Sequence, residues 1–202
     1  MRVTYNFEDT TGSDQELRTL EVDGVTRECL LNVPDGNPSG EAMPLLFNFH
    51  GLGGTAQQQL ADSELGPLAA RDNFILVTPQ AVGGTWTVTG FPISNDADDF
   101  GFITALIDEI AARHNADLNR VYATGMSQGG FLAFDLACSF SDIFAAIAPV
   151  SGAKAPPLQH STPPCSKTGF SQHPGPPGPA PAPPPARSRE ARGAPASRSL
   201  PV

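Results

Sequence analysis

A five-residue pattern, Gly125-Met126-Ser127-Gln128-Gly129, constrains this chain more than any other feature. It follows a strand-like run at 120–124 and opens a helix-like run at 130–138. Small residues two before and two after the serine let a strand and a helix cross closely, and the sharp turn exposes the hydroxyl as a nucleophile. The pattern therefore predicts a nucleophile elbow and points to an ester or acyl hydrolase. The alternative is a glycine-rich turn without chemistry.

The chain divides into two parts of opposite charge. Residues 1–152 carry six Lys or Arg and twenty Asp or Glu, a net charge of −14, whereas residues 153–202 carry six and one, a net charge of +5. The second part also holds fourteen of the twenty-one prolines, so it buries too little apolar surface to offset the entropy of ordering. We expect a partial α/β domain at 1–152 and a disordered Pro/Ala/Arg-rich tail at 153–202. The tail has two interpretations: a genuine polyproline-type extension, or an artefact of the reading frame or gene model. An uninterrupted reading frame in the transcript through the codon for Gly152 would exclude the artefact.

Hydrophobic periodicity in the first part predicts strands that alternate with helices. Near-continuous apolar strands separated by helices are typical of a mostly parallel sheet covered on both faces, so the expected fold class is α/β. An Asp23-Gly24 turn predicts a hairpin before that sheet begins. The expected strands are 17–22, 25–33, 44–50, 73–79, 120–124 and 143–150, and the expected helices are 56–72, one from Asp98-Asp99, and 129–139.

Acyl transfer needs two backbone amides aimed at the developing oxyanion. Gln128, the residue after the nucleophile, supplies the first amide by its position. The second is expected from the glycine-rich loop 50–54, where Leu52 is favoured and Gly51 comes next. The alternative for this loop is a flexible strand-to-helix turn.

Three other residues have two interpretations each. Trp86 either lines a substrate pocket or acts as a packing anchor. Asp98 and Asp99 either orient a substrate-binding loop or cap the helix that follows them, and the cap is favoured.

With these residues the chain resembles the esterase family that groups poly(3-hydroxybutyrate) depolymerases with feruloyl and acetylxylan esterases. The resemblance covers roughly 17–152 and implies an α/β-hydrolase fold, no cofactor, a usually secreted enzyme, and a Ser/Asp/His triad that attacks esters of polymers or of plant cell-wall phenolics. Its motifs are the loop 50–54, the segment around Trp86, the helix start at 98–103, and the run from 120–130 continuing to 144–152.

In that family the acid and the histidine follow the serine, on loops after strands that come later than residue 152. His50 belongs to the oxyanion loop and His114 ends a helix, while His160 and His173 lie in the proline-rich tail. Asp135 and Asp142 are expected to be solvated or capping residues. We therefore assign no acid and no base, and expect this incomplete, truncated or frameshifted chain to be nearly inactive and poorly soluble. It could instead be a non-enzymatic half-domain whose proline-rich tail binds a partner, or a peptidase or lactone hydrolase on the same fold.

The remaining composition excludes several classes of function. Cys29, Cys138 and Cys165 show no metal-binding spacing, so no metal site is expected. The acidic first part argues against nucleic acid, and no apolar run approaches membrane-spanning length. No export signal precedes the domain, so the location is extracellular by resemblance or cytoplasmic if the start is correct. The oligomeric state stays open.

Overall fold

A computed structural model describes residues 5–8, 15–35 and 40–152. The tail predicted at 153–202 lies outside the described residues. In the described part, no helix combines the length and the apolar character needed to cross a membrane. The strands are β1 (Tyr5–Glu8), β2 (Gln15–Val22), β3 (Val25–Asn32), β4 (Met43–Phe49), β5 (Ile75–Pro79), β6 (Ala116–Met126) and β7 (Phe144–Val150). The helices are α1 (Ala56–Ser63), α2 (Leu65–Asp72), α3 (Asp99–Arg113) and α4 (Gln128–Ser139), with a short 3-10 helix η1 (Val82–Gly84).

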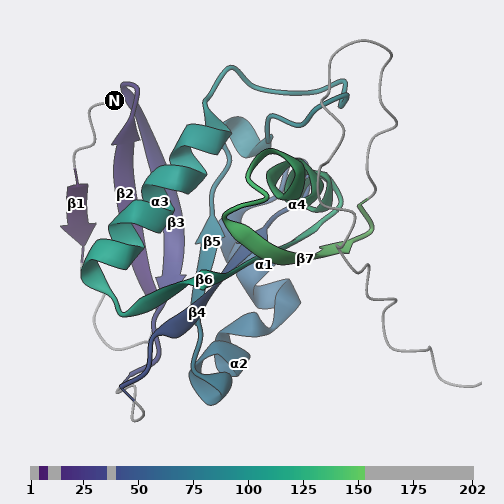
Figure 1. Cartoon of the computed structure of the whole chain (residues 1–202). Coiled ribbons are helices and arrows are strands. Elements are labelled where there is room, and N and C mark those ends of the chain that lie inside the picture. Colours follow the sequence, from purple (N-terminus) through teal and green to yellow (C-terminus); the bar gives the residue numbers. More distant parts are fainter. Residues whose placement is uncertain (1–4, 9–14, 36–39, 153–202) are drawn as a thin grey trace, which may run out of the picture.

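The described strands form one sheet in the order β1-β2-β3-β5-β4-β6-β7 (Figure 1). Strands β1, β2 and β3 pair antiparallel, and β3 joins β5 antiparallel. From β5 through β4 and β6 to β7 every pairing is parallel. The predicted mostly parallel α/β sheet is confirmed, with an antiparallel margin that begins at the predicted hairpin. Asp23 and Gly24 both have positive φ, as a tight hairpin turn requires.

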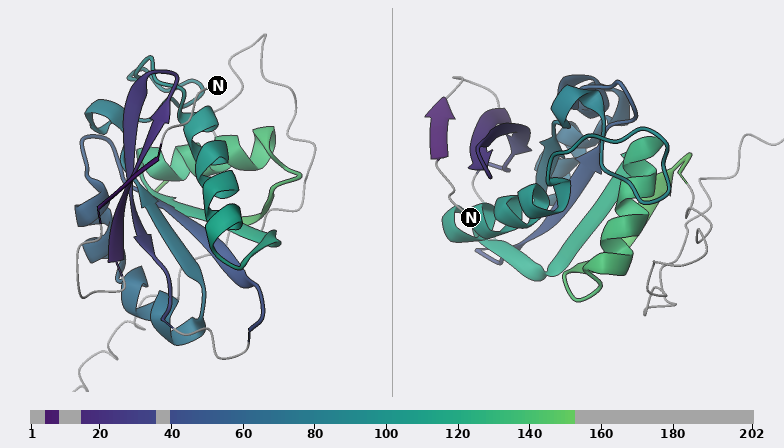
Figure 2. Two further views of the ribbon diagram at one scale, coloured as in Figure 1. Left: turned by 90° about the vertical axis from the view of Figure 1, so that its left-hand side faces the viewer. Right: turned by 90° about the horizontal axis from the view of Figure 1, so that it is seen from above.

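Helices cover both faces of the sheet, as Figure 2 shows. Helices α3 and α4 pack on one face and α1 and α2 on the other. Alternate residues of β4 therefore point in opposite directions: Leu45, Phe47 and Phe49 join the main apolar cluster with α3 and α4, whereas Asn48 bonds to Gln59 of α1. This alternation follows from the two-residue period of a strand.

The single helix predicted at 56–72 is two helices. Glu64 separates α1 from α2 in the left-handed conformation, with φ 52° and ψ 23°. Pro67 then lies in the first turn of α2, where its missing N–H removes no intrahelical hydrogen bond. A proline in the middle of one continuous helix would have removed such a bond, so the break resolves the conflict.

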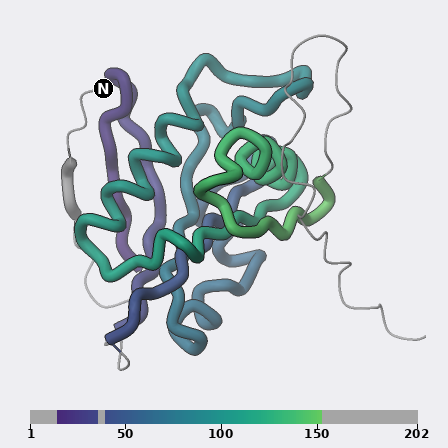
Figure 3. Tube along the Cα trace, viewed as in Figure 1, coloured from purple at the N-terminus to yellow at the C-terminus, as the bar shows by residue number. Residues whose placement is uncertain are grey.

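A long excursion joins β5 to α3. Residues 80–97, which we call the strap, arch over the carboxyl ends of the central strands in the trace of Figure 3. The elbow serine lies at the same edge of the sheet, because β6 ends there. This edge is therefore where the predicted site residues can meet.

Candidate active site

Ser127 occupies a strained turn between β6 and α4. Its φ of 51° and ψ of −116° are unusual for a residue with a side chain. The Ser127 N–H donates to the carbonyl of Val150 in β7 at 2.8 Å, and the Ser127 carbonyl accepts from the Gly130 N–H at 2.9 Å. The strand, turn and helix predicted around the serine are thus present, and backbone bonds on both sides hold its conformation.

The elbow needs glycine at two positions because the backbones nearly touch. A Cβ added to Gly125 would lie 2.6 Å from backbone atoms of Gly129. A Cβ added to Gly129 would lie 2.3 Å from the carbonyl oxygen of Phe49. These contacts give a physical reason for the small residues on either side of the serine.

The loop at 50–54 lies beside the serine. A Cβ built on Gly51 would be 3.5 Å from the Ser127 Cβ. The Gly53 N–H donates to the carbonyl of Gly84 in the strap at 2.7 Å, and the Gly54 N–H donates to the carbonyl of Gly51 at 3.0 Å. In the described part of the chain, no acceptor is seen for the Leu52 N–H.

The Gln128 amide is the other predicted donor. As the first residue of α4, Gln128 has no intrahelical acceptor for its N–H, and the N-terminal end of a helix favours negative charge. None of the described residues accepts that N–H either. The assignment of Gln128 and Leu52 as oxyanion donors, with Gly51 as the neighbouring candidate, remains a prediction.

His50 stabilises the loop and is not free to act as a base for Ser127. Its Nε2 accepts from the Ala81 N–H at 3.1 Å, so Nδ1 carries the proton and donates to the Gly51 carbonyl at 2.7 Å. Burial lowers the pKa of His50 from its ordinary 6.5, and the Gly51 bond opposes this shift. The ring is therefore neutral, and both of its nitrogens are already bonded.

Trp86 packs beneath the loop. Its side chain has no exposed surface, and its Nε1 donates to the His50 carbonyl at 2.9 Å. Its ring packs edge-on against the ring of Phe49, with 5.4 Å between the ring centroids. These contacts agree with the interpretation of Trp86 as a packing anchor, and its role in a substrate pocket stays a prediction.

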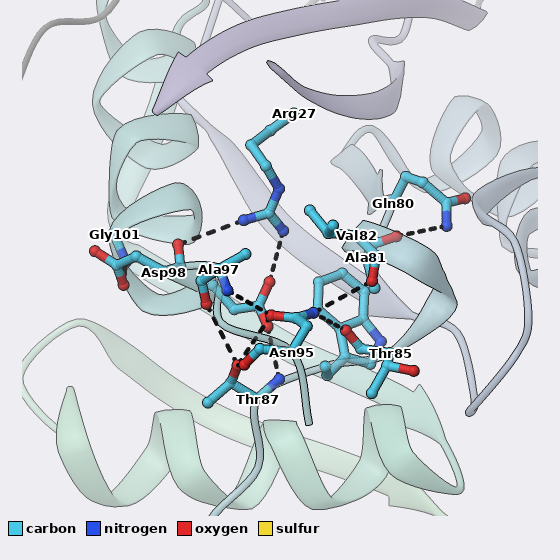
Figure 4. Close-up of polar contacts among 12 residues, drawn as sticks. Arg27, Gln80, Ala81, Val82, Thr85, Thr87, Asn95, Ala97, Asp98 and Gly101 are labelled. Carbon is cyan, nitrogen blue, oxygen red and sulfur yellow. Dashed lines mark hydrogen bonds and ion pairs between the residues drawn. The ribbon is translucent and has the colours of Figure 1, made fainter. Parts of the chain in front are cut away.

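The two aspartates at the start of α3 have different roles. Asp98 caps the helix, accepting from the Gly101 N–H at 2.8 Å. Asp99 is fully buried, forms an ion pair with Arg27 at 2.6 Å, and accepts from the strap N–H of Thr87 at 2.6 Å. Figure 4 shows how Arg27 reaches the start of α3. The favoured cap is thus right for Asp98, whereas Asp99 orients a loop.

Asp135 corrects a further expectation. Predicted as a solvated or capping residue, it instead accepts from the Thr89 N–H in the strap at 2.6 Å. Burial raises its pKa, and its bonds with Thr89 partly oppose that shift. Sequence reasoning missed Asp135 as a strap anchor and gave the loop-orienting role of Asp99 only as the less favoured alternative, because the partners of both residues are remote in the chain.

A pocket of about 230 Å³ opens beside the loop. Four exposed apolar side chains, Leu52, Ile93, Met126 and Val150, belong to segments that meet at the elbow. Trp86 does not line this pocket, which is bounded by His50, Gly51, Leu52, Gly53, Gly54, Thr55, Gln58, Gln59, Asp62 and Met126.

Within the described ranges, no group of three or more His, Cys, Asp or Glu side chains could hold a metal ion. The other histidine described, His114, follows the last residue of α3, at the opposite end of that helix from Asp98. In this part of the chain no imidazole is placed to act as a base for Ser127.

Comparison with known proteins places these residues in a wider group. The family model described as Esterase PHB depolymerase matches residues 29–161. Feruloyl esterase B of Piromyces equi is 33% identical over 127 residues, which are 61% of this chain and 23% of that protein. Poly(3-hydroxyalkanoate) depolymerase C of Paucimonas lemoignei is 32% identical over 128 residues, which are 60% of this chain and 30% of that protein.

A solved structure shares the fold. Acetyl xylan esterase from Aspergillus awamori superposes with a TM-score of 0.54 and 20% identity, over 76% of this chain and 53% of that one. The chain spans less than half the length of the curated relatives it matches.

Proposed function

Because the chain belongs to the Esterase PHB depolymerase family, we propose that it is a serine carboxylic ester hydrolase with Ser127 as its nucleophile. The observation that carries this proposal is the strained conformation of Ser127 at the strand–helix crossing, with the loop 50–54 beside it. A residue with a side chain persists in such a conformation only when its surroundings impose it, and such strain clusters at active sites.

The proposed chemistry is acyl transfer without a cofactor. The Ser127 Oγ attacks the ester carbonyl carbon, a C–O bond forms, and the carbonyl oxygen becomes an oxyanion. The amides of Gln128 and Leu52 donate to that oxygen, and removing one such donor typically lowers kcat by about 10²- to 10³-fold. Collapse of the intermediate expels the alcohol, and water then releases the acid from the acyl-enzyme.

The serine also needs a base to remove its proton, and the described residues do not provide one. His50 uses both ring nitrogens to hold the loop. Loss of triad members lowers turnover by about 10⁴- to 10⁶-fold. We therefore propose that Ser127 and its two amides by themselves support only slow turnover.

The substrate class is proposed from the relatives and the surface around the serine. The relatives carry the names feruloyl esterase and poly(3-hydroxyalkanoate) depolymerase. Exposed Leu52, Ile93, Met126 and Val150 suit an apolar acyl group. We propose that the substrates are polyesters or esters of plant cell-wall phenolic acids. We also propose an extracellular location, where such polymers occur.

Labelling with a fluorophosphonate tests the nucleophile without requiring turnover. Because the described residues provide no base, the expected result is slow phosphonylation, located at Ser127 by peptide mass spectrometry and absent from Ser127→Ala. Slow release of acid from aryl esters by the wild type, and none by the variant, would support the same assignment. A wild-type chain that remains unlabelled at Ser127 would contradict the proposal.

A further inference from the structure

The two predicted oxyanion donors belong to different elements. Leu52 lies in the loop after β4, and Gln128 begins α4. Both amides must point at one oxygen atom, and such constellations need placement within about 0.5 Å. Something must therefore fix the loop relative to the helix.

The Gln128 side chain binds the strap with all of its hydrogen-bonding groups. Its Oε1 accepts from the Trp86 N–H at 3.1 Å. Its Nε2 donates to the carbonyls of Trp86 and Ile93, each at 3.2 Å. The residue has no exposed surface, so water does not replace a lost partner, and an unpaired buried polar group is costly.

The strap in turn holds the loop. Trp86 Nε1 donates to the His50 carbonyl at 2.9 Å, and the Gly84 carbonyl accepts from the Gly53 N–H at 2.7 Å. The latter bond fixes the peptide that follows Leu52. The chain of contacts therefore runs from the Gln128 carboxamide through Trp86 to both sides of the Leu52 amide.

Helix α4 grips the strap twice on one face. Asp135 lies seven residues after Gln128, which is two helical turns, so both side chains point the same way. Asp135 accepts from the Thr89 N–H at 2.6 Å. Gln128 binds Trp86, which itself bonds to the loop. The contact made by Gln128 is therefore the one that affects the oxyanion donors.

We propose that the Gln128 side chain is a positioning residue for the oxyanion hole. It fastens the strap to α4, and the strap sets the His50–Gly54 loop so that the Leu52 amide faces the same point as the Gln128 amide. One residue thus supplies one donor through its backbone and positions the other through its side chain. This inference rests on the proposed esterase function.

The test uses Gln128→Met, which keeps the backbone amide and the side-chain length but removes the carboxamide. Ile110→Val is the control, because Ile110 is buried in α3 and its truncation lowers stability without touching the strap. Trp86 is the sole tryptophan of the chain, so fluorescence reports directly on the strap. We expect a red-shifted emission and faster acrylamide quenching in Gln128→Met and an unchanged spectrum in Ile110→Val.

The second measurement is the rate at which the fluorophosphonate labels Ser127. We expect the rate to fall about 10- to 100-fold in Gln128→Met, as misplacement of a catalytic group does, and to stay at the wild-type value in Ile110→Val. Equal rates in wild type and Gln128→Met would overturn the inference, whether or not the fluorescence changes. Absence of labelling in the wild type would instead overturn the proposed function, and the inference with it.

Discussion

Replacing Asp99 by Asn should destabilise the protein more than any conservative change on its surface. The side chains of Arg27 and Asp99 are 1% and 0% exposed, and their charged groups are 2.6 Å apart. Asn keeps the shape of Asp and can still accept from the Thr87 N–H, which Asp99 does at 2.6 Å. The variant therefore removes the negative charge while the strap hydrogen bond can persist.

The magnitude follows from the burial of the remaining charge. Arg27 lies 4.1 Å from the centre of the Phe102 ring and bonds to the Asp98 carbonyl, so its cation cannot move to solvent. Breaking a buried pair by removing one partner typically costs about 3–5 kcal/mol. Because total unfolding free energies are about 5–15 kcal/mol, this loss is a large fraction of the stability. Arg27→Met should have a similar effect, since it leaves the Asp99 carboxylate buried without its cation.

The double variant distinguishes a buried charge from a lost contact. Replacing both ions by neutral groups removes the uncompensated charge, so Arg27→Met/Asp99→Asn should be destabilised by clearly less than the sum of the single variants. Urea unfolding followed by Trp86 fluorescence measures all four free energies. Asp72→Asn is the matched control, because its pair with Arg71 is exposed, at 50% and 68%, and it should show no measurable loss. An Asp99→Asn loss below about 1 kcal/mol, or strict additivity, would refute the reasoning.

Three further predictions concern the elbow and the strap. Burial lowers the pKa of His50 below 6.5, so the unfolded chain binds more protons at this residue and the unfolding free energy should fall as the pH drops below 6.5. Urea titrations at several pH values should show a shallower fall in His50→Gln. Burial raises the pKa of Asp135 above 3.8, so its contribution is lost as the pH rises through the folded-state pKa; the stability of Asp135→Asn relative to wild type should therefore increase from pH 4 to pH 7, and a decrease would contradict this. Gly129→Ala places a Cβ 2.3 Å from the Phe49 carbonyl oxygen and should lower the unfolding free energy by about 3 kcal/mol or more. At Gly53 a Cβ has open space but the φ is +73°, so Gly53→Ala should lower it by about 1–2 kcal/mol. A lower melting temperature for Gly53→Ala than for Gly129→Ala would contradict the close backbone contact at Gly129.

Features coded by neighbouring residues could be predicted. The turn at Asp23-Gly24 and the cap at Asp98 each depend on residues within a few positions, and both are present in the structure. The elbow is equally local, because its glycines and serine lie within one turn of chain. The helix expected at 56–72 is interrupted at Glu64, and Pro67 in the first turn of α2 is a local signal that a helix begins there.

Features that join remote segments could not be predicted from local pattern. Asp99 and Arg27 are 72 positions apart, and Gln128 and Trp86 are 42 apart. One signal was available in β3, where Arg27 shares a face with the buried residues Cys29 and Leu31. An arginine at such a position requires a buried acidic partner, but choosing Asp99 among the twenty acidic residues of 1–152 needs the fold.

The position of the strap explains why buried charge and backbone strain occur at the same edge of this sheet. Ser127 is held in a conformation that costs about 1–3 kcal/mol, so neighbouring structure must resist its relaxation. Helix α4 supplies that resistance only if its first turn cannot shift, and the Gln128 side chain ties this turn to Trp86. The strap is itself fixed at Thr87 by Asp99, whose charge is compensated by Arg27. The buried ion pair and the strained serine are therefore linked by one series of contacts that runs through the strap. A change at Arg27 should affect the nucleophile through these hydrogen bonds rather than through the field of its charge.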